Sequence, residues 1–247
     1  MRIVFSRKGF DTSSGGGPSP IVAGRPVSLP IPDTRGIAQT TYGDLGLGDH
    51  VNAASRGRLG DGDLCHDDPL FTDGGECIFG QCGAAQTHLE RQGVGRGDVF
   101  LFFGLFRTRD EGKPCGKPHH RIFGYLQVRE VTLLADGVPD DARNLRHPHT
   151  LRLYARNDCL WRGEGQVAAR ASAALRLTVP GGPPSLWHRP NWLKRGGLTY
   201  HDRPDRWLPG RQLKSVARGQ EFVADIGRRE APRRWLADII TAIKASG

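Results

Sequence analysis

The first twenty residues hold the densest group of side chains and glycines suited to binding an anion. A short apolar segment leads into Arg7, Lys8 and Asp11, which are followed by Ser13, Ser14 and three consecutive glycines. Glycine lets backbone N–H groups converge on an anion, and the cations supply charge. The pattern predicts a loop that holds a phosphate or a sugar, with Asp11 as an acid, base or hydroxyl-orienting group. A flexible Gly/Ser turn is the alternative. The Gly-Lys-Ser/Thr of a Walker loop is absent.

Two further groups of polar residues have the composition of catalytic sites. The motif His66–Pro69 places an imidazole beside two carboxylates, which can orient a water, a sugar hydroxyl or a divalent metal. A solvated turn is the alternative for this motif. Glu221 is a candidate base, with Arg218 and Gln220 as substrate contacts around an intervening glycine. A structural Arg–Glu pair is its alternative.

Gln81, Gln86 and His88 lie on or near one expected helix, over residues 79–92. Glutamine offers both a donor and an acceptor, as reading the edge of a flipped base requires. Polar residues beside a core are the ordinary alternative.

These groups combine into one hypothesis about a site. We predict that Asp11, His66 and Glu221 are catalytic and converge with Arg7 and Gln81 around one pocket. The predicted substrate-binding residues are Arg7, Lys8, Ser13, Ser14, Gln81, Gln86, His88, Arg218 and Gln220.

No metal or cofactor is assigned from the sequence. Cys65, His66, Cys77 and Cys82 would suffice in number for zinc, but their spacing matches no strong finger or deaminase signature. The histidines of the segment 147–149 could also bind a metal or flank a phosphate, but an exposed loop pair is the expectation. The cysteines are odd in number, which does not favour a disulfide framework.

Positive charge is concentrated in residues 185–235, which carry more than twice as many Lys and Arg as Asp and Glu and four of the five tryptophans. Cations mixed with rings that stack on bases are typical of a nucleic-acid surface. The candidate contacts are Arg189, Trp192, Lys194, Arg195, Arg206 and Trp207. The alternative is that the tryptophans anchor the core and the arginines form a solvated face.

Composition predicts the fold class and the main elements. With 34 glycines, 17 prolines and 37% apolar residues, the 247-residue chain is expected to be one loop-rich α+β domain over 1–247. We expect a curved sheet or small barrel and an amphipathic C-terminal helix from Pro232. Residues 99–106 and 121–134 are expected to pair as strands. Other strands are expected at 27–32, 151–154 and 175–179, with loops at 33–62 and 107–119.

Two segments of the chain resemble known families. The segment 97–104 with 122–128 is similar to the central hairpin of PUA-like domains of the EVE and ASCH types, which implies a base-sized pocket. More of the chain resembles the nucleotide modification associated domain family, third type. That resemblance is carried by Ser6–Asp11 with 13–21, Ser28–Pro32, Cys65–Pro69, Phe79–Leu89 and Arg218–Val223. It implies a role in making, editing or recognising modified nucleotides in DNA.

Three classes of function remain open at this stage. The first is an enzyme that acts on a modified base or nucleotide by hydrolysis or group transfer, and we favour it. The second is a non-catalytic reader that flips out and binds a modified base. The third is a scaffold that brings other DNA-modification enzymes to DNA. Without a membrane-spanning run or a signal-peptide core, the protein is expected to be cytoplasmic with no membrane partner.

Overall fold

The computed structural model describes residues 1–217 and 221–245. The strands are β1 (Arg2–Arg7), β2 (Ser19–Val22), β3 (Arg25–Pro26), β4 (Ile31–Pro32), β5 (Cys65–His66), β6 (Leu70–Phe71), β7 (Glu76–Gln81), β8 (Val99–Asp110), β9 (Lys113–Leu133), β10 (Cys159–Val167), β11 (Leu186–His188), β12 (Trp207–Leu208), β13 (Gln212–Lys214) and β14 (Glu221–Asp225). The α-helices are α1 (Gly48–Ser55), α2 (Gly83–Arg91), α3 (Pro148–Leu151) and α4 (Glu230–Lys244). Short 3₁₀ turns occupy Leu134–Asp136, Asp140–Ala142, Ala173–Leu175 and Pro204–Arg206.

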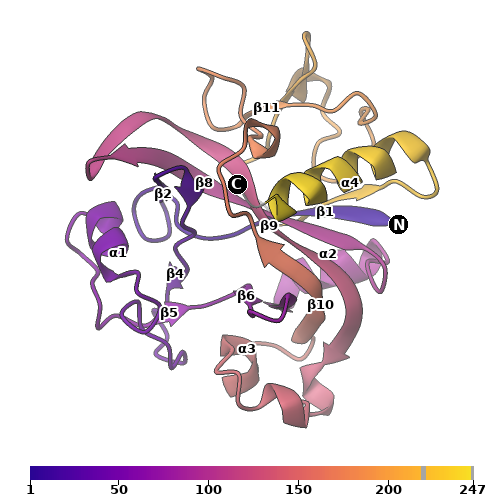
Figure 1. Ribbon diagram of the computed structural model, residues 1–247. Helices are drawn as coiled ribbons and strands as arrows, with labels where there is room; N and C mark the ends of the chain where they lie inside the picture. The colour runs from indigo at the N-terminus through magenta and orange to yellow at the C-terminus, as the bar shows by residue number, and fades with distance from the viewer. Residues whose placement is uncertain (218–220, 246–247) are drawn as a thin grey trace.

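A large mixed sheet organises the molecule (Figure 1). Its strands follow the order β14-β1-β8-β9-β10-β7-β6. β2 pairs with the outer part of β8, and β3 pairs with β2. β8 runs parallel to β1 and β2, whereas β8 and β9 form a long antiparallel hairpin that turns at Glu111 and Gly112. Over the described residues the sheet stays open rather than closing into a barrel. The α+β class and the curved-sheet expectation are therefore confirmed, and the barrel is not formed.

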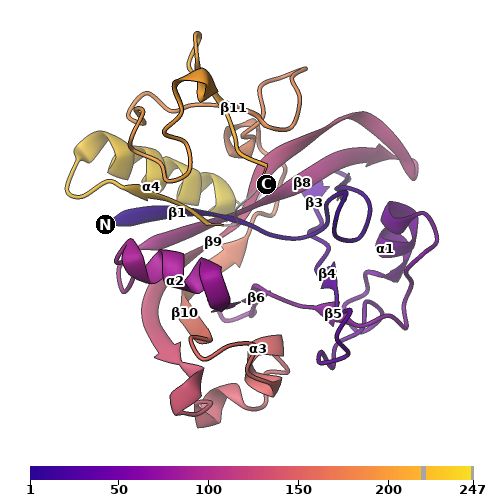
Figure 2. The same cartoon turned by 180° about the vertical axis from the view of Figure 1, so that it is seen from behind.

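Both faces of the central strands are covered, which explains the unbroken apolar run of β8. Phe5 and Leu101 pack with α4 on one face, whereas Val4 and Phe100 pack with α2 on the other. The two views show α4 crossing one face of the sheet and α2 the opposite face (Figures 1 and 2). A strand buried on both sides is apolar at every position instead of alternating.

Residues 186–214 add a small sheet, of order β11-β13-β12, to the α4 side of the molecule. Trp187 of β11 and Leu213 of β13 belong to the same core cluster as α4. The expected C-terminal helix is confirmed, although it begins two residues earlier, at Glu230. Among the described residues, no helix has the length and apolar character needed to cross a membrane.

The helix expected over 79–92 is a strand followed by a helix. Glu76–Gln81 form β7, which pairs with β10, and α2 begins only after Cys82, which has an extended backbone. The expectation was wrong because a short apolar segment does not distinguish strand from helix without its partner. The position of the helix end is confirmed, since α2 ends just before Gly93, whose φ is +64°.

Four other local expectations were wrong or only partly right. The loop expected at 107–119 is the far end of the β8–β9 hairpin. The strand expected at 151–154 covers the last residue of α3 and the irregular chain after it. Residues 175–179 make only isolated bridges, and the strand expected at 27–32 is reduced to β4. β10 has no counterpart among the expected strands, because its glycines weaken the strand pattern.

The loop expected at 33–62 contains α1 and forms a small core with the N-terminal segment. Phe10, Tyr42, Val51 and Cys65 are fully buried together there. Gly17 makes the close approach possible, because a Cβ at that position would lie 2.4 Å from the carbonyl oxygen of Ala54 in α1. This packing holds the glycine-rich loop that follows β1 against α1.

Candidate functional site

The candidate site is a cavity of about 580 Å³ where the chain leaves β1, β5 and β7. That volume lies within the range of small-molecule sites. It is lined by Arg7, Lys8, Gly9, Asp11, Ser13, Ser14, Ile31, Pro32, Asp33, Thr34, Arg35, His66, Asp68, Gly80, Gln81, Cys82, Gly83, His149, Tyr154, Ala155 and Ala217. Seven of the sequence-predicted site residues therefore share one cavity: Arg7, Lys8, Asp11, Ser13, Ser14, His66 and Gln81.

Asp11 shapes the loop at the open side of the cavity. Its Oδ1 accepts hydrogen bonds from the backbone N–H of Ser13 at 2.7 Å and of Ser14 at 2.8 Å, and its Oδ2 lies 3.1 Å from Arg7. Burial would raise the pKa of Asp11, but these hydrogen bonds and Arg7 outweigh it and lower that pKa. Both carboxylate oxygens are thus engaged in closing the turn.

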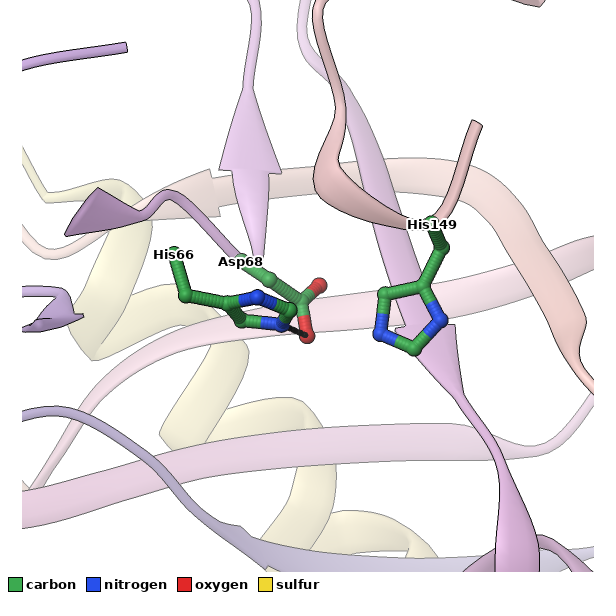
Figure 3. A group of neighbouring side chains, drawn as sticks. All are labelled: His66, Asp68 and His149. Atoms are coloured by element: carbon green, nitrogen blue, oxygen red, sulfur yellow. Dashed lines mark ion pairs between the residues drawn. The ribbon is translucent and has the colours of Figure 1, made fainter. Parts of the chain in front are cut away.

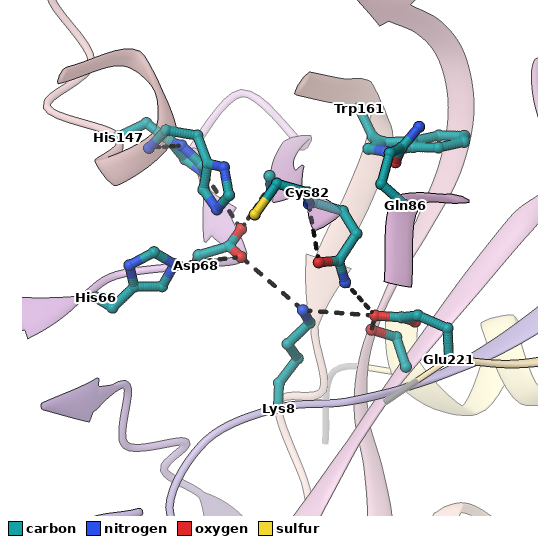
Figure 4. A network of polar contacts seen from close by, with 12 residues as sticks. Lys8, His66, Asp68, Cys82, Gln86, His147, Trp161 and Glu221 are labelled. Atoms are coloured by element: carbon teal, nitrogen blue, oxygen red, sulfur yellow. Dashed lines mark hydrogen bonds and ion pairs between the residues drawn. The ribbon is translucent and has the colours of Figure 1, made fainter. Parts of the chain in front are cut away.

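Lys8 is a largely buried cation shared by two carboxylates (Figure 4). Its Nζ lies 3.9 Å from Oδ2 of Asp68 and 3.7 Å from Oε1 of Glu221. It also lies 4.0 Å from the centre of the Phe79 ring, in the position of a cation–π contact. Lys8 therefore links the cavity to a carboxylate on β14.

Asp68 is the buried acid of the cavity, with only 3% of its side chain exposed. Its Oδ1 accepts from the backbone N–H of Gly80 at 2.9 Å and contacts Nε2 of His147 at 3.2 Å. Burial would raise the pKa of Asp68, but the His147 hydrogen bond and the Lys8 charge hold it well below its usual range. Asp68 is accordingly a carboxylate at neutral pH.

Two cavity-lining histidines, His66 and His149, lie beside Asp68, and only His66 was predicted from the sequence to be a site residue. His66 Nε2 lies 3.9 Å from Oδ2 of Asp68, and burial lowers the pKa of His66 to about 4, against the opposing effect of Asp68. His149 is 5% exposed, and its Nδ1 lies 2.5 Å from Oδ1 of the fully buried Asp158. A carboxylate on one ring nitrogen fixes the tautomer and leaves the other nitrogen as an acceptor.

His147 and His149 were expected to be exposed, and both are buried. They begin α3, where the His147 ring accepts from the backbone N–H of His149 and Pro148 occupies the first helical turn. The His149 ring packs directly over Gly80 of β7, where any side chain would collide with it. The histidines flanking a proline and the aspartate nine residues further on were the available signal.

Glu221 lies beside the cavity rather than on its lining. It is 1% exposed, and its Oε1 accepts from Gln81 at 2.7 Å and from Ser6 at 3.2 Å. Its Oε2 has no hydrogen-bond partner among the described residues. Burial raises the pKa of Glu221 despite the opposing charge of Lys8.

Two sequence-predicted binding residues lie away from the cavity lining. Gln86 accepts from Nε1 of Trp161 at 3.2 Å and donates to Glu90, so both ends of its amide are engaged in packing. His88 contacts Thr199 and stacks on Tyr200. Arg218 and Gln220 lie outside the described residues.

The cysteine-rich set considered for zinc is divided between separate parts of the molecule. Cys65 packs in the small core beside α1, whereas Cys77 belongs to the cluster beneath α2. All five cysteines are free thiols. Within residues 1–217 and 221–245, ligand atoms instead gather in two overlapping groups, His66 with Asp68 and His149, and Cys82 with His149 and Asp158.

The tryptophans of the basic segment pack largely inward. Trp187 is 3% exposed, and Trp192 and Trp207 pack against the same core cluster. Arg189 donates to the carbonyl of Leu193 and lies over the Trp207 ring. Lys194 and Arg195 are exposed, whereas Arg206 is half-buried. The nucleic-acid surface stays a prediction, and Lys194 and Arg195 are the exposed members of its candidate contacts.

Comparison with known proteins gives one match over most of the chain. The family model for nucleotide modification associated domain 3 matches residues 2–225. A curated protein, the XylDLEGF operon transcriptional activator of Pseudomonas putida, is 35% identical over 69 residues, which are 28% of this chain and 21% of that protein. The match thus spans about a fifth of the relative's length. No solved structure matches the chain.

Proposed function

We propose, because the chain belongs to the nucleotide modification associated domain 3 family, that its pocket binds a nucleotide carrying a modified base and transforms it by hydrolysis or group transfer. The family associates the chain with nucleotide modification. The observation that carries the chemical part is the polarity of the cavity. Its buried end holds His66, Asp68 and His149, whereas its open side carries a cation and hydroxyls.

The open side suits a phosphate or a sugar. Arg7, Ser13 and Ser14 line it, and the turn closed by Asp11 holds the two serines in place. A guanidinium and a serine hydroxyl on a glycine-rich loop bind phosphate oxygens through charge-assisted hydrogen bonds. Ser14 supplies the hydroxyl, since that of Ser13 donates to Oδ1 of Asp11 at 2.7 Å. The substrate's charged group would therefore face the open side.

The buried end is suited to activating a water or a hydroxyl. Two imidazoles and a carboxylate face one another there, and the His149–Asp158 contact fixes one ring. Lys8 supplies a positive charge beside the same carboxylate, where it can stabilise negative charge that develops on the substrate. A non-catalytic reader would have no need of this buried set of titratable groups.

DNA is the substrate form that the surface charge favours. The chain carries a net charge of +9, and Lys194 and Arg195 are exposed in the basic segment 185–235. Exposed cations of this kind neutralise phosphates without reading sequence. We expect DNA to be a better substrate than the free nucleotide.

The test is incubation of the purified protein with phage DNAs carrying different modified bases, and with the matching mononucleotides, followed by nucleoside mass spectrometry. We expect one modified nucleoside to be released or converted. His149→Gln and His66→Asn are each expected to slow conversion by about 10²–10⁴-fold, the usual effect of losing an acid–base group. His88→Gln, outside the cavity, is the matched control and should convert at the wild-type rate.

The outcomes separate the classes of function. Unchanged DNA together with selective binding to one modified DNA would identify a reader instead of an enzyme. Conversion that survives both His149→Gln and His66→Asn would place the chemistry outside the buried end of this cavity.

A further inference from the structure

We propose that His66, Asp68 and His149 bind a divalent first-row transition-metal ion at the buried end of the cavity. One ligand atom from each lies within 4.8 Å of the others, and all three residues line the same cavity. Figure 3 shows the two imidazole rings on either side of the Asp68 carboxylate. The role of this ion in turnover rests on the proposed function, whereas its binding does not.

The Asp68 carboxylate has one oxygen available for an ion. Oδ1 is occupied by the backbone N–H of Gly80 and by His147. Oδ2 makes no hydrogen bond to the described residues, and its polar neighbours are Lys8 and His66, each at 3.9 Å. Because Asp68 lines the cavity and Oδ2 makes no hydrogen bond there, this oxygen can bind a ligand that enters the cavity.

A carboxylate orients the His149 ring, as is usual for histidines that bind a metal. Its Nδ1 contacts Oδ1 of Asp158, while Oδ2 of Asp158 accepts from the backbone N–H of Tyr154 at 2.8 Å. This leaves Nε2 with its lone pair available. A carboxylate behind a coordinating imidazole fixes its tautomer and raises its basicity, as in many metal sites.

His66 is oriented from the opposite side. The Tyr154 hydroxyl lies 3.4 Å from its Nδ1, so Nε2 is the nitrogen that faces Asp68. Tyr154 therefore contacts the surroundings of both imidazoles, through its hydroxyl and through its backbone. An ion at 2.0–2.1 Å from its ligands holds them about 3 Å apart, so His66, the most exposed of the three, would move inward by about 1 Å.

The overlapping group of Cys82, His149 and Asp158 fits an ion less well. Both oxygens of Asp158 are already engaged, and the residue is fully buried. An ion bound by both Asp158 and Nδ1 of His149 would also have to replace the hydrogen bond between these two groups. The atoms offered by the other set, Nε2 of His66, Nε2 of His149 and Oδ2 of Asp68, make no hydrogen bond to the described residues.

The donor set indicates the class of ion and its use. Two imidazoles and one carboxylate suit Zn²⁺, Fe²⁺, Co²⁺ or Mn²⁺ rather than Mg²⁺ or Ca²⁺, which take oxygen ligands. Three protein ligands leave positions for a water or a substrate oxygen, as in catalytic zinc sites. Lys8 remains paired with Glu221 when Oδ2 of Asp68 turns to the ion. The ion would polarise the bound water beside the substrate.

Co²⁺ titration of the chelator-treated full chain tests the site, because its visible absorption reports the ligand geometry. We expect one Co²⁺ per chain, displaced by one Zn²⁺ counted by mass spectrometry. Asp68→Asn and His66→Asn are each expected to weaken Co²⁺ binding by about 100-fold, the upper range for losing even a supporting group. Cys82→Ser is the matched control and should bind as the wild type does. Circular dichroism confirms that each variant is folded.

The results distinguish this site from the proposed function. No stoichiometric Co²⁺ or Zn²⁺ binding at 100 µM metal, or binding lost in Cys82→Ser but kept in His66→Asn, overturns the proposed ligand set. Conversion of DNA that persists in chelator would remove the ion from the reaction and leave the proposed function standing. Metal binding without conversion of any DNA would support the metal site and contradict the proposed function.

Discussion

Asp11 illustrates how a residue of catalytic type can serve a structural purpose. In the sequence it is the carboxylate of an anion-binding loop, and acid–base work follows naturally from that setting. In the structure its Oδ1 holds the backbone of Ser13 and Ser14, and its Oδ2 pairs with Arg7. An oxygen already accepting two or three hydrogen bonds is a poor proton acceptor.

The substitution Asp11→Asn separates these roles. The amide oxygen keeps the turn, and only the pairing with Arg7 is lost, so we expect substrate affinity to fall by about fivefold, as for a partly exposed ion pair of ~1 kcal/mol. We expect kcat to stay within about threefold of the wild type, since no acid–base group is lost. Single-turnover and binding measurements on the same DNA check this, with Asp44→Asn, whose side chain does not line the cavity, as the control. A kcat lower by 100-fold would restore Asp11 as a catalytic group.

The residues of the site differ in how far the sequence reveals them. Arg7 was identifiable because it follows an apolar strand, and His66 because an imidazole stands beside two carboxylates. Gln81 was identified by its amide, although on a helix that is a strand at this position. His149 and Asp158 were not identifiable, because they lie in a segment without periodicity, and their contact depends on α3 packing over β7. Gln86 is the opposite case. Its amide was predicted to bind a base, but its oxygen accepts a hydrogen bond from Trp161.

At the scale of elements, the sequence specifies those that carry their own pattern. The continuous apolar run of β8 and the amphipathic face of α4 can be recognised in the sequence without knowing what packs against them. β7 and β10 cannot be recognised in this way, because their conformation depends on their pairing with each other. The same holds for α1, which is defined by packing on Phe10 and Tyr42 rather than by periodicity.

Gly80 on β7 provides a test of how strands position the site. A Cβ there would lie 2.2 Å from Cδ2 of His149, so Gly80→Ala must displace that ring. We expect Co²⁺ binding and DNA conversion to fall by at least tenfold, and stability to fall by about 1–3 kcal/mol, as for overpacking. Urea denaturation and Co²⁺ titration measure the two effects.

Gly62→Ala is the control for Gly80→Ala, because a Cβ at Gly62 meets no atom of residues 1–217 or 221–245 within 4 Å. It should behave as the wild type in both measurements. Wild-type Co²⁺ affinity in a folded Gly80→Ala variant would show that the His149 ring position is not needed for the site.

At the scale of the whole molecule, buried histidines tie stability to pH. His120 of β9 is 7% exposed, and its Nδ1 accepts from Nε1 of Trp187 at 3.0 Å. Burial lowers the pKa of His120 to about 3, and Arg7 lowers it further against the opposing charge of Asp11. The pKa of the neighbouring His119 is also lowered, to about 4, by burial and by the charge of Arg176. The folded chain therefore requires both rings to be neutral.

The sign of the pH effect follows from these shifts. The unfolded imidazole binds a proton below its usual pKa of 6.5, whereas folded His120 stays neutral down to about 3. Stability is therefore lost as the pH falls from 6.5 towards 3. Between pH 7 and pH 5, protonation of the unfolded His120 alone lowers the free energy of unfolding by about 2 kcal/mol.

His120→Asn measures this contribution, since its side-chain oxygen can replace Nδ1 as the acceptor for Trp187 and does not titrate. We expect the variant to be less stable at pH 7, because ring packing against Phe103 is lost, but to lose about 2 kcal/mol less than the wild type between pH 7 and pH 5. Urea denaturation at the two pH values gives both differences. Equal losses in the two proteins would mean that His120 has the same pKa in the folded and the unfolded chain, so that burial does not exclude its proton. Its Nδ1 would then carry a proton at pH 5 and could not accept from Trp187, the contact that joins β9 to the basic, tryptophan-rich segment.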